Sequence, residues 1–164
     1  MKVPVHVDGA RIFNAAVAQQ VAVKDLLGET EVIRLAKRAR KRVGGGMRQA
    51  GVLAAMGMYA VQHNVERLAE DHQRAKRLGH ALKENGFQLL REGQIDTNIV
   101  YFGLPDDCSL SRDDFVSRLN SDYGVKVTGG YSSGGKLFRA VTHMHIDDAG
   151  IDRAIEGMVA LGSS

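Results

Sequence analysis

The sequence has 164 residues, of which 44% are hydrophobic and 25% charged, so it can build a packed core and allows one domain or a domain and a fragment. A net charge of +3 permits anionic ligands without requiring nucleic acid. The single cysteine, Cys108, excludes an intramolecular disulfide and favours a reducing compartment, the cytoplasm. No stretch is long and apolar enough to span a bilayer, so no membrane partner is expected.

The stretch from Val5 to Ala16 joins an apolar run to a charged turn. Residues 4–7 are typical of a strand, Asp8 stands where that strand would end, and Gly9 lets the backbone turn. In open parallel sheets ligands bind just beyond the carboxyl ends of the strands. There Asp8 could hold a cationic ring nitrogen and Arg11 an anionic group. An ordinary Asp-Gly turn followed by a surface arginine explains these residues equally well.

Helical patterns fill the next part of the chain. Residues 12–22 predict a helix followed by a turn, and Thr30 is a suitable N-cap for a basic helix that the triple glycine at 44–46 ends. The basic side of that helix could bind nucleic acid, but no aromatic residue is interleaved with it to stack on bases. A solvated helix face is therefore the preferred interpretation. Residues 47–85 predict two further helical pieces, ended by Gly86.

The last third predicts a small α+β layer domain. Strands are expected at 97–102, 125–128 and 137–141, Ser111 caps a helix over 112–122, and Asp147 starts a final helix. The glycine-rich loop at 129–136 lies between two strands, which favours a hairpin loop over a phosphate cradle. Cys108 is expected to be a free surface thiol. The histidines at 63, 72 and 80 are spaced too widely to share one metal ion, so no metal site is predicted.

Two strings in the chain resemble the low-specificity L-threonine aldolases. They are H-V-D-G-A-R-I-F-N-A-A at 6–16 and G-G-G-M-R-Q-A-G at 44–51. Members of that family are pyridoxal-phosphate (PLP) enzymes that cleave L-threonine or L-allo-threonine to glycine and acetaldehyde, which makes them carbon–carbon (aldehyde) lyases. The resemblance implies an α/β fold of the PLP-dependent transferase-like type (fold type I), present in part. Residues 1–60 would be a remnant of the PLP-binding large domain, and 61–164 a connecting helix with the C-terminal α+β small domain.

The resemblance also implies roles for single residues. Asp8 would be the partner of the pyridine nitrogen of PLP, and Arg11 would lie against the cofactor and substrate side of the ring. Arg48 looks like the arginine that reaches toward the cofactor phosphate, in this family often across a subunit interface. Arg139 is similar to the late arginine that binds the substrate carboxylate. The expected partners are therefore an amino-acid substrate and further subunits of a homo-oligomer.

The chain departs from the family at one decisive place. The family has an S-K-G-L-G segment with the Schiff-base lysine between the two strings, and no such segment occurs here. Lys24 and Lys37 remain in the interval without a flanking Ser and Gly, and the N-terminal part of the family is also lacking. We assign no catalytic residue and expect the chain alone to be inactive and poorly soluble. The alternative is a shortened isoform, a degenerate copy or an incomplete gene model that associates with full-length subunits.

Overall fold

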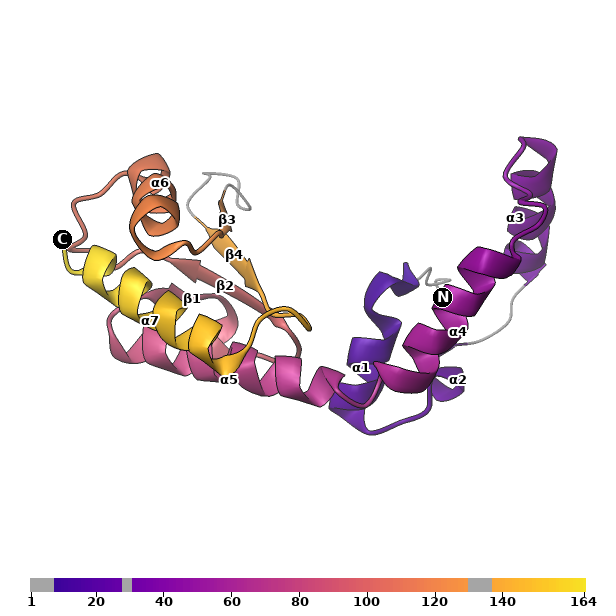
Figure 1. The fold of residues 1–164 in the computed structure, drawn as a ribbon, viewed down its shortest axis with the longest axis horizontal. Coiled ribbons are helices and arrows are strands. Elements are labelled where there is room, and N and C mark those ends of the chain that lie inside the picture. The colour runs from indigo at the N-terminus through magenta and orange to yellow at the C-terminus, as the bar shows by residue number, and fades with distance from the viewer. Residues whose placement is uncertain (1–7, 28–30, 130–136) are drawn as a thin grey trace, which may run out of the picture. The chain divides into compact units, whose positions relative to one another are not determined.

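The computed structural model describes residues 8–27, 31–129 and 137–164 (Figure 1). By its internal contacts the chain divides into unit 1, Met1–Arg67, and unit 2, Leu68–Ser164. The division follows contacts within the chain, so the assignment of residues 1–60 and 61–164 to a large and a small domain stays a prediction. No helix in the described part of the chain is long and apolar enough to cross a membrane.

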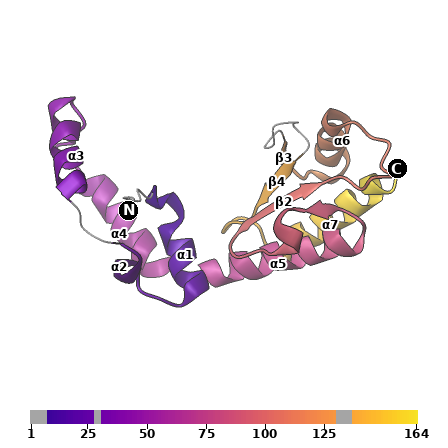
Figure 2. The same ribbon diagram turned by 180° about the vertical axis from the view of Figure 1, so that it is seen from behind.

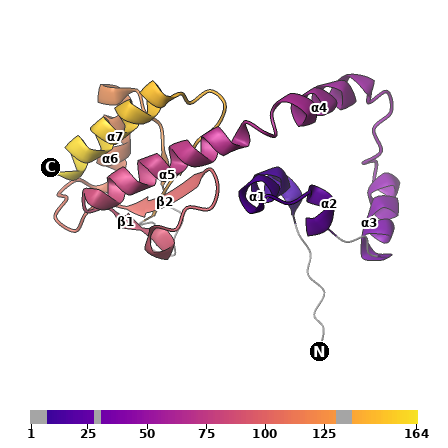
Figure 3. The same ribbon diagram turned by 90° about the horizontal axis from the view of Figure 1, so that it is seen from below.

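Unit 1 is helical throughout its described residues. After a 3-10 turn at Gly9–Arg11 come α1 (Ile12–Gln19), α2 (Val23–Leu26), α3 (Glu31–Arg42) and α4 (Gly51–His63), which Figure 3 shows one after another. The first predicted helix is confirmed as α1, which ends where Gln20 takes a left-handed conformation with φ 56°. The predicted strand at 4–7 and the proposed cap Thr30 lie outside the described residues.

The side chains of α3 and α4 are largely exposed. Every residue from 34 to 42 is exposed, including the apolar Leu35 of α3. All thirteen residues of α4 are exposed as well, although the helix is mostly apolar; Met56 is 62% and Tyr59 63% accessible. Single exposed apolar residues are ordinary, whereas a run of this extent is uncommon on the surface of a monomeric protein.

Unit 2 combines an antiparallel sheet with three helices. In chain order it contains α5 (Leu68–Glu84), β1 (Gln88–Leu89), a 3-10 segment η2 (Leu90–Gly93), β2 (Ile99–Gly103), α6 (Arg112–Tyr123), β3 (Thr128–Gly129), β4 (Phe138–Val141) and α7 (Asp148–Gly162). The strand order is β1-β2-β4-β3, and every neighbouring pair is antiparallel. Figure 2 shows β2 and β4 side by side in the middle of the sheet.

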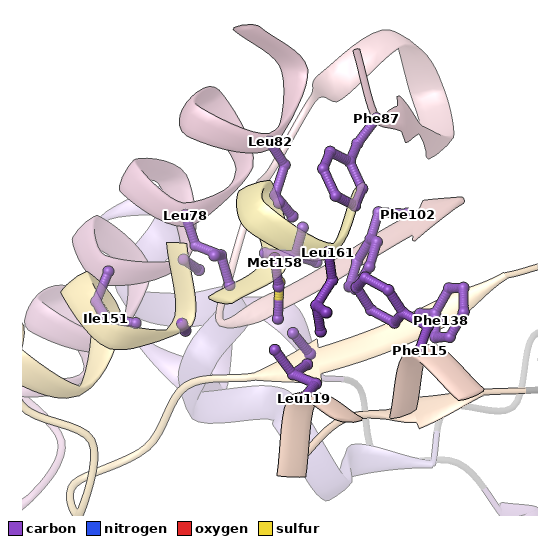
Figure 4. Close-up of a cluster of buried hydrophobic side chains, with 14 residues drawn as sticks. Leu78, Leu82, Phe87, Phe102, Phe115, Leu119, Phe138, Ile151, Met158 and Leu161 are labelled. Carbon is purple, nitrogen blue, oxygen red and sulfur yellow. The ribbon is translucent and has the colours of Figure 1, made fainter. Parts of the chain in front are cut away.

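The core of unit 2 lies between one face of the sheet and its helices (Figure 4). Side chains alternate along a strand, so Val100, Phe102, Phe138 and Ala140 point to the same face, and all four are buried. The rings of Phe102 and Phe138 stack with centroids 5.2 Å apart, and Phe115 from α6 lies 5.3 Å from Phe138. Helices α5 and α7 complete this apolar layer, with Leu78, Leu82, Ile151, Met158 and Leu161.

Local signals set the ends of these helices as the sequence predicts. Ser111 accepts a hydrogen bond from the Asp114 N–H, and Asp147 accepts one from the Gly150 N–H at 2.7 Å, so each side chain satisfies a donor of the first turn. Gly86 follows α5 with φ +82°, a backbone conformation that glycine adopts without cost. Exposed ion pairs add contacts between helices, because Arg74 on α5 contacts Asp148 on α7 at 2.9 Å.

Two expectations for unit 2 need correction. The predicted strand at 125–128 pairs only at Thr128 and Gly129, because residues 124–127 leave the end of α6 before they reach the sheet edge. Strand β1 was not expected at all: it is two residues long and pairs with Gly103 and Phe102 of β2. A pair of residues is too short to show the alternation that indicates a strand.

Candidate functional site

Asp8 and Arg11 lie at the two ends of one 3-10 turn. Asp8 is exposed and caps the turn, because its Oδ1 accepts a hydrogen bond from the Ala10 N–H at 3.1 Å. This is the usual behaviour of an aspartate at an N-cap. Arg11 closes the turn and is half-buried. The turn therefore has the geometry of an ordinary capped turn, with a carboxylate at its start and an arginine at its end.

Arg48 is exposed on the segment that joins α3 to α4. The glycines before it reverse the chain: the Gly45 N–H donates to the Arg40 carbonyl at 2.8 Å, and a Cβ at Gly45 would lie only 2.6 Å from the Arg40 Cγ. Glycine is therefore needed at position 45 for this close approach. The local geometry therefore explains the glycines, because they allow the chain to turn at the end of α3. The Arg48 guanidinium remains accessible to an anion.

Arg139 lies in the middle of β4, on the sheet face opposite the core, since its neighbours Phe138 and Ala140 are buried. It is half-buried, with Tyr101 of β2 and Thr128 of β3 as its partners in register. Directly opposed residues on one face have Cβ atoms about 5 Å apart. Tyr101 also lines a hollow of about 210 Å³ together with Leu89 and residues of the η2 loop.

The sequence pointed to Arg139 but not to Tyr101 or Thr128. These two flank the arginine only through strand pairing, and strand pairing cannot be read from a single strand. Alternation along β2 puts Tyr101 on the same face as Ile99, but it does not identify the residue that faces Tyr101 on the next strand, so the sequence held no signal for either neighbour.

A buried polar cluster stands beside this sheet, at the ends of β2 and β4. The Asn98 side chain donates to the Thr142 carbonyl at 2.7 Å, and the Thr142 hydroxyl donates to the Asp71 carbonyl on α5 at 2.6 Å. Burial lowers the pKa of His72 below 6.5; the charge of Asp71 opposes this shift and that of Lys76 adds to it. Asn98, to which the sequence assigned no role, therefore ties two strands and a helix together.

The cofactor expectation can be compared with these residues. An exposed carboxylate at Asp8 and accessible guanidinium groups have the chemistry to pair with a ring nitrogen and a phosphate. Covalent attachment of PLP needs a lysine enclosed with them. The lysines between the two motif strings, at 24, 37 and 41, are all exposed on helices. The described residues of unit 1 thus fit ionic contacts to the cofactor and do not fit its covalent attachment.

The four predicted site residues are distributed over the chain. Asp8 and Arg11 share one turn of unit 1, Arg48 lies on a separate segment of that unit, and Arg139 belongs to unit 2. Their participation in one site stays a prediction. Among the residues that the structure describes, no group of three or more His, Cys, Asp or Glu side chains is arranged to hold a metal ion. Cys108 is half-buried rather than fully exposed, and its thiol lies 3.6 Å from the Leu161 carbonyl.

Sequence comparisons relate the chain to known enzymes. Residues 25–104 match the Beta-eliminating lyase family. The low specificity L-threonine aldolase of Escherichia coli O157:H7 is 36% identical over 138 residues, covering 70% of this chain and 40% of the relative. The probable low-specificity L-threonine aldolase 2 of Arabidopsis thaliana is 32% identical over 170 residues, covering 90% and 47%. The chain thus spans less than half the length of these relatives.

Solved structures show the fold. An alanine–glyoxylate aminotransferase from Nostoc sp. superimposes with a TM-score of 0.53 at 17% identity, covering 66% of this chain and 29% of that protein. A lysine-to-alanine variant of C-DES with glycine covalently linked to its PLP cofactor has the same TM-score at 20% identity, covering 67% and 28%. These likenesses confirm the predicted fold class, part of a PLP-dependent fold type I chain. By its sequence, this chain is a relative of the low-specificity L-threonine aldolases among the beta-eliminating lyases.

Proposed function

We propose that this 164-residue chain keeps part of the amino-acid-binding apparatus of a threonine aldolase and does not by itself cleave L-threonine to glycine and acetaldehyde. The observation that carries the proposal is the placement of the lysines between the two motif strings, all of which are exposed on helices. The alignment with the Arabidopsis relative runs over 170 residues, more than this chain contains, so that relative has residues for which this chain has no counterpart. The exposed lysines support loss of the lysine segment, and the alignment length is consistent with a shortened chain.

The remaining residues would each bind one part of a substrate complex. Asp8 would hold the protonated pyridine nitrogen, with Arg11 beside the ring, and Arg48 would hold the phosphate. Arg139 would bind the substrate carboxylate, because a guanidinium group can form two parallel hydrogen bonds with it. PLP, when bound, supplies an electron sink for the bond that breaks. In this proposal residues 1–60 belong to the PLP-binding large domain and 61–164 to the connecting helix and small domain, in a cytoplasmic protein.

The test is a visible-absorbance titration of the purified chain with PLP, followed by borohydride reduction and intact-mass measurement. We expect no stoichiometric reducible adduct and no acetaldehyde from L-threonine or L-allo-threonine. A single reduced adduct on one lysine, together with threonine cleavage, would show that another lysine replaces the missing one, and the proposal would be wrong. Lys24→Arg, Lys37→Arg and Lys41→Arg variants would then identify that lysine.

A second candidate function is association with full-length aldolase subunits or with another copy of the chain. It is favoured by α4, whose apolar side chains Val52, Leu53, Met56 and Tyr59 are each more than half exposed. Burial of such a surface is worth about 25 cal/mol per Å² of apolar area. Sedimentation velocity should therefore show association that a Met56→Glu variant weakens, whereas Gln62→Glu, which places the same charge at a polar position of α4, leaves it unchanged. Monomers in both variants and in the original chain would exclude this role.

A further inference from the structure

A cavity of about 320 Å³ opens on the helical side of the unit 2 sheet. It lies between β4, the segment that leads from α6 to β3, and the first half of α7. Its walls are mainly apolar, and three of the residues that line it, Leu78, Ile151 and Met158, are labelled in Figure 4. A volume at the lower end of the range for ligand sites, with few polar groups, suits a small molecule with an aliphatic body.

The polar groups that line this cavity are cationic or neutral. Lys126, His143 and Arg153 contribute to the lining, and no acidic residue does so. Within the described part of the chain, neither Lys126 nor Arg153 makes an ion pair, whereas most arginines of unit 2 contact a carboxylate, namely those at 74, 77, 91, 112 and 118. Two cations that make no ion pair beside an apolar wall favour an anion that carries its own apolar group.

The neighbouring groups also favour a ligand that accepts hydrogen bonds. The His143 Nδ1 accepts a hydrogen bond from the His145 N–H at 3.3 Å, so in the neutral ring the proton is on Nε2, which remains a donor. Gly150 at the start of α7 lines the cavity. The nearby acid, Asp147, accepts the Gly150 N–H at 2.7 Å and so serves as the helix cap.

We propose that this cavity binds a short branched aliphatic carboxylate, with the carboxylate between Lys126 and Arg153 and the aliphatic group against the half-buried side chains of Val125, Val127 and Ile146. The residues that line the cavity offer no carboxylate to an ammonium group, so a zwitterionic amino acid binds less well than the simple acid of the same shape. The ligand thereby differs in charge from an aldolase substrate.

This cavity is separate from the predicted substrate arginine. Ala140 lines the cavity, and its neighbour Arg139 points to the other face of the sheet because side chains alternate along β4. Binding here depends on neither PLP nor the roles proposed for Asp8, Arg11 and Arg48. The two proposals can therefore fail independently.

The test uses three probes of one shape on the full chain: isovalerate, its uncharged amide isovaleramide, and the zwitterion leucine. Methyl resonances of Val125, Val127 and Ile146, the half-buried aliphatic residues of the lining, are followed by NMR during each titration. Isovalerate should shift these resonances saturably and bind about tenfold more tightly than the amide or leucine. Equal affinity for isovalerate and isovaleramide, or no shift of these methyl groups with isovalerate, would overturn the proposal.

Variants then assign the cations. Lys126→Gln and Arg153→Gln should each weaken isovalerate binding about tenfold while leaving isovaleramide unaffected. Arg118→Gln is the matched control: this arginine is exposed on α6, is paired with Asp122 and does not line the cavity. Unchanged isovalerate affinity in both cation variants would contradict the proposed position of the carboxylate. So would an equal loss in the control.

Discussion

Gly157 in the middle of α7 gives a sharp test of how closely α6 and α7 pack. Replacing a glycine by alanine inside a helix normally stabilises a protein by about 1 kcal/mol, because glycine loses more backbone freedom on folding. At this position, however, an added Cβ would lie 2.6 Å from the Cγ of Tyr123 and 3.0 Å from the Cδ1 of Leu119. Both neighbours belong to α6, and Leu119 is fully buried. The contact is with Cγ, the ring atom that joins the rest of the Tyr123 side chain, so a small rotation of the ring does not relieve it.

Overpacking of this kind costs about 1–3 kcal/mol. Because one of the two contacts involves a fully buried side chain, we place the cost in the upper part of that range. After subtraction of the helix-propensity gain, Gly157→Ala should destabilise unit 2 by about 1–2 kcal/mol. The readout is amide hydrogen exchange of the central strand β2 in the full chain, since those amides exchange only when the unit opens.

Two variants separate the contributions. Ala160→Gly, at an exposed position of α7, measures the propensity effect alone and should cost about 1 kcal/mol. Removing the ring with Tyr123→Ala should make a subsequent Gly157→Ala change less costly or favourable, which is a coupling that a double-mutant cycle detects. If Gly157→Ala stabilises β2 against exchange in the original background, then the two helices do not approach as closely as described and the reasoning is refuted.

Three further predictions concern the core and the polar cluster of unit 2, and β2 amide exchange measures each of them. Asn98→Ala should destabilise the unit by about 1–3 kcal/mol, because the buried Thr142 carbonyl loses its donor; an effect near zero would mean that water replaces the amide. Phe102→Ala should cost about 3–5 kcal/mol by opening a cavity in the stacked rings, and a much smaller loss would indicate a loosely packed core. Stability should decrease as the pH falls through 6.5 toward the lowered pKa of His72, because the unfolded chain binds a proton there that the buried ring does not. His72→Gln should reduce that slope, and an unchanged slope would assign it to other groups.

The sequence was most informative where a local rule decides the structure. Ser111 and Asp147 cap their helices as expected, and the turn at Gly86 follows directly from the need for a positive φ. Strand β2 was recognisable because residues 99–102 form a run of β-branched and aromatic side chains. In each of these cases a few neighbouring residues contain the whole cause.

The sequence was less informative where the cause lies elsewhere in the chain. The basic helix before the triple glycine was predicted correctly, but whether its Leu35 is covered depends on what packs against it, and in the described residues it is half exposed. The two helical pieces predicted over residues 47–85 are α4 and α5, and the sequence did not show that the first of them ends at His63. For the candidate site, Arg139 was singled out from a motif, whereas its neighbours Tyr101 and Thr128 come from other strands.

The pairing of β2 with β4 has a consequence for how the chain is made. These two strands form the middle of the sheet, and the whole of α6 and the segments around it separate them in sequence. While the chain emerges from a ribosome, β2 has only the two-residue β1 to pair with, and its apolar edge stays open. The edge of β2 stays open until Phe138–Val141 has been synthesised and can pair with it. Contacts between segments so far apart in sequence slow folding. A ribosome that pauses between α6 and β4 would therefore hold the nascent chain at its most aggregation-prone length.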